Sequence, residues 1–362
     1  MFSFALYIFS FILNDDKIKL CVLTHSIKES LGMAKIKDIA EQTGFSITTI
    51  SRVLNQDKSF NVSEETRLKI MTASEELNYV PLNQRQKGKG KKKALTFGLI
   101  YWYDVSEELT DPYYLSMRIA VENYCEKNQI KLSRYRMGET ILEQLELANL
   151  DGIIALGKYS DTEILNFHHL HVPLVLLDCY HKHYEIDVVM ANLHEATEDI
   201  ITYLKSANLK SIGFIGGIEE TLDGEVLQDA RLTTYQQAFK THLSTTYLGK
   251  FNADSGYDIM THIIQKGKLQ PAYIIASDSL ALGCLKALNE NNIQVPNQVS
   301  LISYNNTSLS QYTIPALTTI DLNTKMMGET AVDLLLEKIT THRKIAKKIF
   351  IPTQLIKRES SI

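Results

Sequence analysis

Apolar residues recur at helical spacing in three short segments near the start of the chain. Residues 36–43 and 47–54 each carry an apolar stripe along one face, and Gly44 separates the two segments. Ser46 and Ser63 stand where an N-cap is needed, the latter ahead of a third helical segment that Pro81 ends. The pattern predicts a small all-α module of three helices.

Beyond residue 94 the pattern changes to short apolar runs that alternate with helical segments. The predicted strands are residues 96–102, 131–135, 152–156, 174–177, 211–215, 273–276 and 300–303. The predicted helices are residues 113–127, 193–207, 231–242, 256–266, 279–291 and 325–340. Strand–helix alternation predicts parallel sheets covered by helices on both faces, and so many strands indicate two α/β lobes rather than one.

A basic segment separates these two parts of the chain. Residues 87–93 read Lys-Gly-Lys-Gly-Lys-Lys-Lys, which favours a flexible linker and lacks the spacing of a phosphate-binding loop. The expected domains are a leader (1–32), a helix-turn-helix domain (33–81), a basic hinge or linker (82–94) and a two-lobed domain (95–358). We expect lobe 1 to comprise about residues 95–191 and 324–350, and lobe 2 about residues 192–320 and the C-terminal strand.

The first 13 residues are almost wholly apolar and are followed by Asn14-Asp15-Asp16. This run is shorter than the roughly 20 residues that a membrane-spanning helix needs, and it lacks the basic start and cleavage site of a signal peptide. The chain then restarts at Met33, directly ahead of the first helix. We expect residues 1–32 to be a misassigned start or a disordered leader, with a membrane anchor as the alternative.

Charge is divided unevenly along the chain. The net charge is −4, yet residues 33–93 hold 12 Lys/Arg against 7 Asp/Glu, and residues 94–362 hold 23 against 32. A basic module on an acidic body indicates a polyanionic partner for the module alone.

The cysteines are far apart, with no metal-ligand or redox spacing, which favours free thiols in a reducing cytoplasm. They are Cys21, Cys125, Cys179 and Cys284.

Two short helices joined by a glycine turn form a helix-turn-helix pattern. The outer face of the second helix carries small, hydroxylic or basic side chains that suit a DNA major groove, in which Thr reaches base edges or phosphates and Arg pairs with guanine. These are Ile47, Thr48, Thr49, Ser51 and Arg52. The alternative is a surface helix in a small helical domain that does not bind DNA.

Several strings of residues add to this interpretation. The strings 35–55, 62–67 and 76–81, and further along 276–283, 295–306 and 315–320, resemble the lactose/galactose (LacI/GalR) repressor family. The resemblance runs from Met33 to about Arg358 and includes Asn55, which we add to the DNA-contacting set. Residues 111–115 and 326–328 are most similar to family repressors of evolved β-galactosidase. The resemblance implies a two-lobed periplasmic-binding-protein-like (type I) domain and a homodimer on double-stranded operator DNA.

The hinge departs from the family pattern. Family members insert a hinge leucine into the minor groove, and this kinks the operator. Here the segment reads Leu82-Asn83-Gln84-Arg85-Gln86-Lys87, in which Leu82 comes too early. Basic contacts from Arg85 and Lys87 are therefore expected in place of the wedge.

Effectors of two-lobed α/β domains bind between the lobes, beyond the carboxyl ends of the strands. There, planar polar groups for sugar hydroxyls come from Asp178, Arg231 and Asn305, and an aromatic face for C–H bonds could come from Trp102, Tyr103 or Tyr113. The residues at the predicted strand ends are Trp102, Asp178, Ser277 and Asn305. Each could instead be a helix cap or a solvated loop end.

The resemblance implies sugar-binding roles for Asp178 and Arg231. Ser277 stands where many family members carry Asn, and Asn305 where many carry Asp, so both are substituted here. Asp278 is expected to cap the following helix rather than to bind ligand.

Other patterns carry less weight. The histidines of residues 168–171 and 181–183 lack an accompanying carboxylate or cysteine frame, so we interpret them as solvated and expect no metal. Residues 213–217 do not fit a dinucleotide fingerprint, and no catalytic constellation is visible, so neither a cofactor nor an enzyme is expected.

The sequence therefore predicts a cytoplasmic, one-component transcription repressor of galactose or β-galactoside genes, released by a small sugar. Regulation by a non-sugar ligand or by corepression is the alternative. A sugar-binding transport protein would share the two-lobed fold but would need a signal peptide and no DNA-binding module.

Overall fold

The computed structural model describes residues 35–55, 60–77, 79, 94–138, 140–183, 185–221, 223–239 and 245–362. The chain divides into two compact units, Met1–Lys93 and Ala94–Ile362. The leader and the hinge residues Leu82, Arg85 and Lys87 lie outside the described residues. None of the described helices is long and apolar enough to span a membrane.

Three helices form the first unit: α2 (Ile36–Thr43), α3 (Ile47–Leu54) and α4 (Glu64–Glu76). Gly44, with a positive φ of 74°, ends α2, a backbone conformation that glycine adopts without the penalty of a Cβ atom. Ser46 and Ser63 cap the next two helices by accepting hydrogen bonds from the backbone N–H groups of Thr49 and Thr66. The inward stripes meet in a core that consists of Ile39, Ile50, Val53, Ile70, Ala73 and Tyr79.

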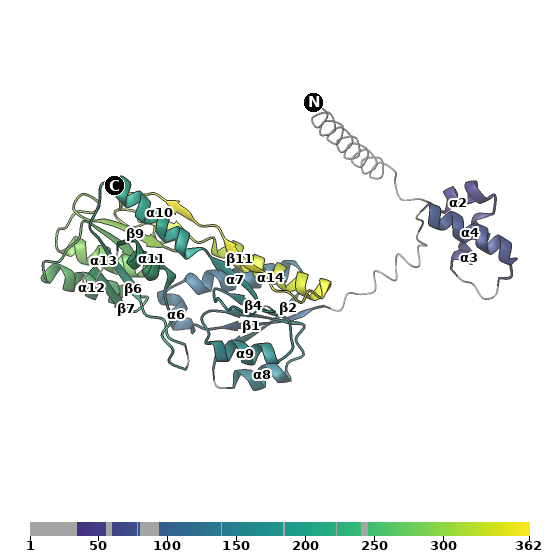
Figure 1. Cartoon of the computed structure of the whole chain (residues 1–362), viewed down its shortest axis with the longest axis horizontal. Helices are drawn as coiled ribbons and strands as arrows, with labels where there is room; N and C mark the ends of the chain where they lie inside the picture. Colours follow the sequence, from purple (N-terminus) through teal and green to yellow (C-terminus); the bar gives the residue numbers. More distant parts are fainter. Residues whose placement is uncertain are drawn as a thin grey trace, which may run out of the picture. The chain divides into compact units, whose positions relative to one another are not determined.

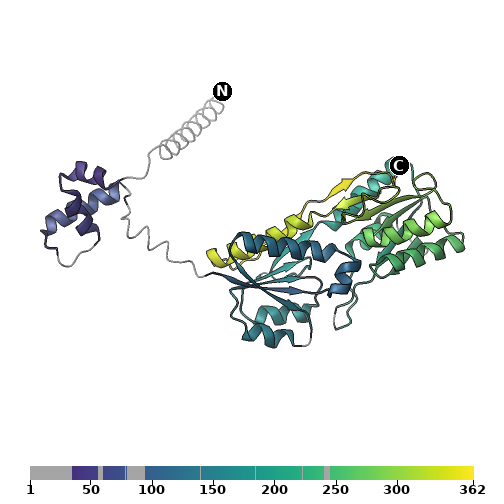
Figure 2. The same ribbon diagram turned by 180° about the vertical axis from the view of Figure 1, so that it is seen from behind.

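Lobe 1 of the second unit contains a six-stranded parallel sheet. Its strand order is β11 (Lys348–Ile351), β5 (Asp187–Ala191), β4 (Leu174–Leu177), β3 (Gly152–Leu156), β1 (Thr96–Tyr101) and β2 (Lys131–Arg136). The accompanying helices are α6 (Val105–Thr110), α7 (Tyr113–Lys127), α8 (Ile141–Leu147), α9 (Asp161–His169) and α14 (Thr324–Thr341). In Figure 2 the yellow α14 lies beside the blue α7 on one face of this sheet.

Lobe 2 contains a second six-stranded sheet, in which only β12 runs antiparallel to its neighbour. Its strand order is β12 (Gln354–Ile356), β10 (Thr318–Asp321), β9 (Ser300–Tyr304), β8 (Ala272–Ile275), β6 (Ile212–Gly217) and β7 (Thr246–Gly249). The helices of this lobe are α10 (Leu193–Ser206), α11 (Ala230–Phe239), α12 (Ala253–Gln265) and α13 (Asp278–Glu290). Helices cover both faces of the sheet, as Figure 1 shows.

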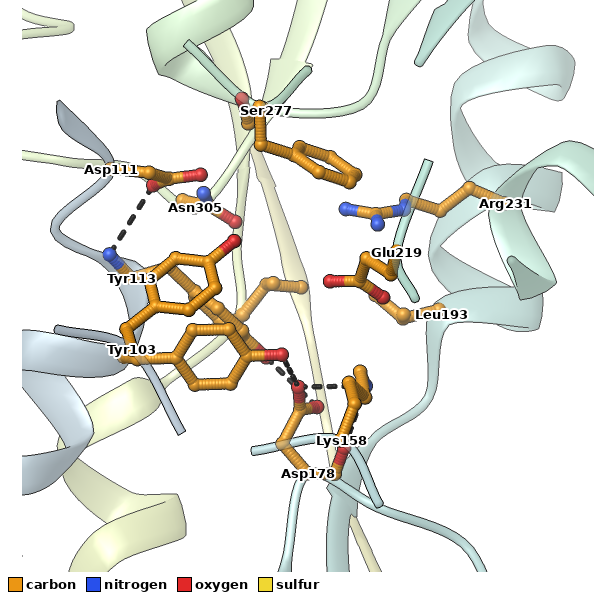
Figure 3. Close-up of a pocket in the computed structure, with 13 residues that line it drawn as sticks. Tyr103, Asp111, Tyr113, Lys158, Asp178, Leu193, Glu219, Arg231, Ser277 and Asn305 are labelled. Atoms are coloured by element: carbon orange, nitrogen blue, oxygen red, sulfur yellow. Dashed lines mark hydrogen bonds and ion pairs between the residues drawn. The ribbon is translucent and has the colours of Figure 1, made fainter. Parts of the chain in front are cut away.

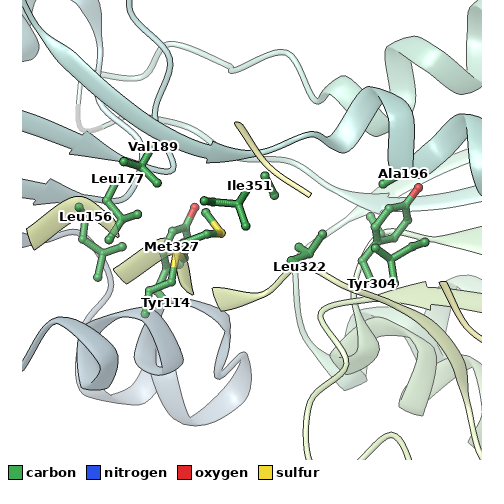
Figure 4. Packing of buried hydrophobic residues seen from close by; sticks show 14 of the residues in the cluster. Tyr114, Leu156, Leu177, Val189, Ala196, Tyr304, Leu322, Met327 and Ile351 are labelled. Carbon is green, nitrogen blue, oxygen red and sulfur yellow. The ribbon is translucent and has the colours of Figure 1, made fainter. Parts of the chain in front are cut away.

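The chain passes between the lobes three times, after β5, after β10 and after β11. One buried apolar cluster extends from lobe 1 into lobe 2. In Figure 4, Leu322 at the second crossing lies between the lobe 1 group around Met327 and Tyr304 of lobe 2. This shared core positions the facing strand ends of the two sheets, where the cavity lies.

The predicted fold class is confirmed: a helical module precedes a two-lobed α/β domain with parallel sheets. All seven predicted strands and all six predicted helices correspond to observed elements, with ends that differ by a few residues. The sequence missed the helices α6, α8 and α9 and the strands β5, β7, β10 and β11, whereas the expected C-terminal strand of lobe 2 corresponds to β12. Each of these missed elements spans nine residues or fewer, too few for a clear period.

One predicted helix cap was wrong. Ser277, rather than Asp278, caps α13, because its Oγ accepts a hydrogen bond from the Leu280 N–H. Asp278 is already helical, and its buried carboxylate accepts hydrogen bonds from the hydroxyl groups of Ser303, Thr307 and Thr319. It therefore connects α13 to the segments around β9 and β10 instead of capping the start of the helix.

Candidate functional site

The helix-turn-helix presents a polar outer face on α3. Residues 47, 48, 51, 52 and 55 follow helical spacing on the side opposite the buried Ile50 and Val53. The side chain of Ile47 is 42% exposed, and Thr48, Arg52 and Asn55 are also exposed. This face can approach a groove without disturbing the core of the module.

Several of these side chains also make local contacts. The Thr49 hydroxyl pairs with that of Ser46, and the Asn55 amide donates to the Ser51 carbonyl at 2.8 Å. The guanidinium of Arg52 lies 5.1 Å from the centre of the Phe60 ring. Thr49 and Asn55 thus help to form the two ends of α3.

A cavity lies between the lobes, at the carboxyl ends of their parallel strands. Polar and aromatic side chains from both lobes line it, as Figure 3 shows. The lining residues are Tyr103, Asp111, Tyr113, Tyr114, Lys158, Asp178, Leu193, Glu219, Arg231, Phe251, Ser277, Asn305 and Leu322. The structure brings six of the seven candidate effector residues named from the sequence to this one cavity: Tyr103, Tyr113, Asp178, Arg231, Ser277 and Asn305.

Asp178 organises the lobe 1 side. It follows β4 with a positive φ of 66°, and its side chain is almost wholly buried. Its two carboxylate oxygens accept hydrogen bonds from the hydroxyls of Tyr113 (3.0 Å) and Tyr114 (3.1 Å), and the Lys158 ammonium lies 2.8 Å away. Although burial disfavours the charged ammonium, the neighbouring carboxylate raises the pKa of Lys158 above its usual value.

Arg231 organises the lobe 2 side, in the first turn of α11. Its Nε donates to both carboxylate oxygens of Asp229 at 2.9 and 3.0 Å, and its Nη1 donates to the Ala276 carbonyl at 2.6 Å. The guanidinium also lies 5.2 Å from the centre of the Phe251 ring. Burial alone would raise the pKa of Asp229, but Arg231 holds it below its usual value.

Two further carboxyl groups face the cavity. Burial raises the pKa of Asp111 to about 7, and the Tyr113 N–H donates to this carboxyl group at 3.3 Å. Burial also raises the pKa of Glu219, which Figure 3 shows between Arg231 and Lys158. Asn305 follows β9 with a positive φ of 103° and lines the cavity.

Trp102 is not among the lining residues. β1 ends at Tyr101, and the Trp102 ring packs instead against the rings of Tyr103 and Tyr114, at centroid distances of 5.1 and 5.8 Å. Because both tyrosines line the cavity, the tryptophan lies directly behind its wall.

Sequence reasoning missed several lining residues. Lys158 and Glu219 are each the second residue after a strand, β3 and β6 respectively, so the strand-end argument could have found them. Tyr114 stands next to a predicted residue, and only the fold shows that its hydroxyl reaches Asp178. Phe251 follows β7, a strand that the sequence did not predict.

The interpretation of the histidines as solvated side chains without a carboxylate holds for His169 and His171, which are exposed, but is wrong for His168 and His181. His181 is buried and lies 3.3 Å from Asp161, while His168 lies 3.4 Å from Glu185. His168, His183 and Glu185 each offer one atom that could bind a metal ion, and these three atoms lie within 4.8 Å of one another. The sequence concealed this cluster because α9 and the segment after β4 meet only in the folded lobe.

Two family models match the chain. Residues 35–82 match the bacterial regulatory proteins of the lacI family, and residues 201–361 match the periplasmic binding protein-like domain. The HTH-type transcriptional regulator GalR of Lacticaseibacillus casei is 34% identical over 91% of this chain and all of its own length. The regulator GanR of Bacillus subtilis is 35% identical over 91% of this chain and 99% of its own length.

Solved structures show the same fold. The lac repressor dimer bound to operator and an anti-inducer aligns over 91% of this chain and all of its own, with 24% identity and a TM-score of 0.65. A complex of the regulator CelR with cellobiose gives the same coverage and TM-score with 20% identity. The resemblance drawn from the sequence motifs is thereby confirmed, and the chain belongs to the LacI family of bacterial transcription regulators.

Proposed function

We propose that the chain is a cytoplasmic repressor that binds a near-palindromic operator as a homodimer and is released by an uncharged sugar. Galactose, a β-galactoside or a related sugar is the effector class that we favour. The role is one of binding, with no catalytic step.

The chemistry of the cavity between the lobes is the observation that carries the sugar assignment. Asp178, Arg231 and Asn305 offer planar polar groups at the strand ends, and the tyrosines beside them offer aromatic faces. Sugars present adjacent hydroxyls on their edges and C–H bonds on their faces, which this combination can bind.

The balance of charge favours an uncharged ligand. Asp111, Asp178 and Glu219 line the cavity, against the two cations Lys158 and Arg231. Both cations already contact carboxylates, Lys158 with Asp178 and Arg231 with Asp229. A phosphate group on the ligand would therefore meet cations that are already paired, with further carboxyl groups beside them.

The exposed face of α3 supports the DNA-binding part of the proposal. One recognition helix reads only a half-site, so two copies are needed for a near-palindromic operator. Ile47 and Thr48 would select the bases, Thr49 and Ser51 would lie close to the DNA, and Arg52 would anchor the helix. Arg85 and Lys87 would add contacts to the DNA backbone.

Release follows from the position of the cavity. A sugar would contact Asp178 from lobe 1 and Arg231 and Asn305 from lobe 2, so its binding would favour one relative orientation of the lobes. The effector must bind the state with low operator affinity more tightly, or the equilibrium would not shift. The linker enters directly before β1 of lobe 1, so a reorientation of that lobe can reach the DNA-binding module.

The test is a panel of sugars, with a purine and an amino acid as controls, measured by Trp102 fluorescence and by release of labelled operator DNA. Trp102 is the only tryptophan of the chain and lies behind the cavity wall. We expect a sugar both to change the fluorescence and to release the DNA, and Arg231→Ala to weaken both effects. A response to the purine or amino acid alone would disprove the sugar assignment, and ligand-tightened DNA binding would indicate corepression.

A further inference from the structure

A second cavity adjoins the first one. It shares four lining residues with the effector cavity: Lys158, Leu193, Glu219 and Arg231. Figure 3 shows these four side chains along one side of the effector cavity, opposite Asp111 and Tyr113. The shared side chains therefore separate two adjacent spaces, so one ligand could contact both.

Both lobes contribute to the second cavity. Lobe 1 provides residues 158–161 with Cys179, Tyr180 and Met190, and lobe 2 provides Leu193, Glu219, Glu225 and residues 227–231. The lobe 2 loop between β6 and α11 also reaches lobe 1, because a hydrogen bond with Ser160 helps to lower the pKa of Asp223. This loop therefore extends across the cleft next to the cavity.

The second cavity opens towards solvent. The side chain of Asp161 is 76% exposed and Tyr180 is 56% exposed, whereas Asp178 and Arg231 of the effector cavity are buried. A ligand that begins in the effector cavity and continues past the shared side chains would thus extend towards the surface.

The lining of the second cavity suits another sugar unit. Tyr180 offers an exposed aromatic ring, Gln228 a planar amide, and Asp161 and Glu225 carboxylates that accept hydroxyl hydrogens. Its Lys and Arg residues are Lys158 and Arg231, both of which already contact carboxylates. The acidic lining disfavours a phosphate and is compatible with an uncharged, hydroxyl-rich group.

We propose that the second cavity is a subsite for a second sugar unit, so that the effector is a glycoside of at least two units. The terminal unit lies against Asp178, Arg231 and Asn305, and the next unit lies between Tyr180 and Gln228. This inference rests on the proposed function and narrows its effector class. A disaccharide that contacts both cavities would bridge the lobes through more residues than a monosaccharide, and would therefore bind more tightly.

The experiment compares matched sugars on the full-length protein: galactose with lactose, galactose with melibiose, and glucose with cellobiose. Binding is measured by titration calorimetry. For at least one pair we expect the disaccharide to bind about tenfold or more tightly than its monosaccharide, since a stacked ring and a few hydrogen bonds supply at least that factor. Equal affinities within every pair would overturn the subsite.

Variants of the second cavity locate the effect. Tyr180→Ala and Gln228→Ala should each weaken disaccharide binding about three- to tenfold and leave monosaccharide binding within about twofold. Tyr312→Ala is the matched control, because Tyr312 is 76% exposed and lines neither cavity. Equal losses for both sugars, or no loss, would overturn the placement.

These outcomes separate the two proposals. Monosaccharide binding that disappears in Arg231→Ala, without any gain from a second unit, would support the proposed function and overturn the subsite. The absence of binding by any sugar of the panel would overturn both.

Discussion

The ion pair between Arg231 and Asp229 allows the folding and ligand-binding roles of Arg231 to be measured separately. Three guanidinium nitrogens are in use: Nε and Nη2 contact Asp229, and Nη1 donates to the Ala276 carbonyl. The side chains of Arg231 and Asp229 are only 10% and 12% exposed. Removal of the arginine therefore leaves a buried carboxylate without its cation.

We expect Arg231→Ala to lower the free energy of unfolding of the effector domain by about 3–5 kcal/mol, the usual cost of breaking a buried pair from one side. In this background Asp229→Asn removes the stranded charge and should restore about 2 kcal/mol or more. The two substitutions should thus be strongly non-additive. Sugar binding should weaken by about 1–3 kcal/mol, or roughly 5- to 150-fold, in Arg231→Ala. The added Asp229→Asn substitution should not restore it.

Urea unfolding followed by Trp102 fluorescence measures the stability, and titration calorimetry measures the sugar affinity. The stability difference between the wild type and Arg231→Ala should be largest at neutral pH. Because Arg231 lowers the pKa of Asp229, its stabilisation is present above the unfolded-state pKa of about 4 and is lost as the pH falls through the lower folded-state value. Arg134→Ala, at an ion pair whose arginine is 59% exposed, should change stability by less than about 1 kcal/mol. If the double variant were no more stable than Arg231→Ala, the stranded charge would not be the cause of the loss.

Three further changes test other parts of the structure. Arg52→Ala should weaken operator binding by about 1–3 kcal/mol in fluorescence anisotropy if the guanidinium pairs with a base, and an unchanged affinity would remove Arg52 from the contact set. The pKa of Asp111, raised to about 7, means that this residue lowers stability increasingly as the pH rises from about 4 to 7. Asp111→Asn should therefore gain on the order of a few kcal/mol relative to wild type in urea unfolding at pH 7.5 compared with pH 4.5, whereas parallel pH profiles would contradict this. Gly283→Ala would place its Cβ 1.8 Å from the Ala253 carbonyl oxygen, and the loss should be about 1–3 kcal/mol or more in thermal or urea unfolding. Gly138→Ala, whose Cβ meets nothing within 4 Å, is the control, and an equal effect of the two would refute the packing argument.

The sequence determined the features that depend on neighbouring residues. The Ser46 and Ser63 caps, the turn at Gly44 and the inward stripe of α3 arise from interactions within a few positions, so a local pattern is sufficient to predict them. The sequence also identified Asp178 and Asn305, because the carboxyl end of a buried strand is visible as the end of an apolar run.

Only the tertiary structure decided which distant side chains meet. Lys158 is 20 residues from Asp178 and Tyr114 is 64 residues from it, yet both contact its carboxylate. The histidine–carboxylate contacts and the contacts of Asp278 likewise join separate elements. Such contacts depend on strand order and on the packing of helices against the sheet, which no single segment encodes. The two adjoining cavities have the same origin, because residues from both lobes line them, at the point where the two sheets face each other.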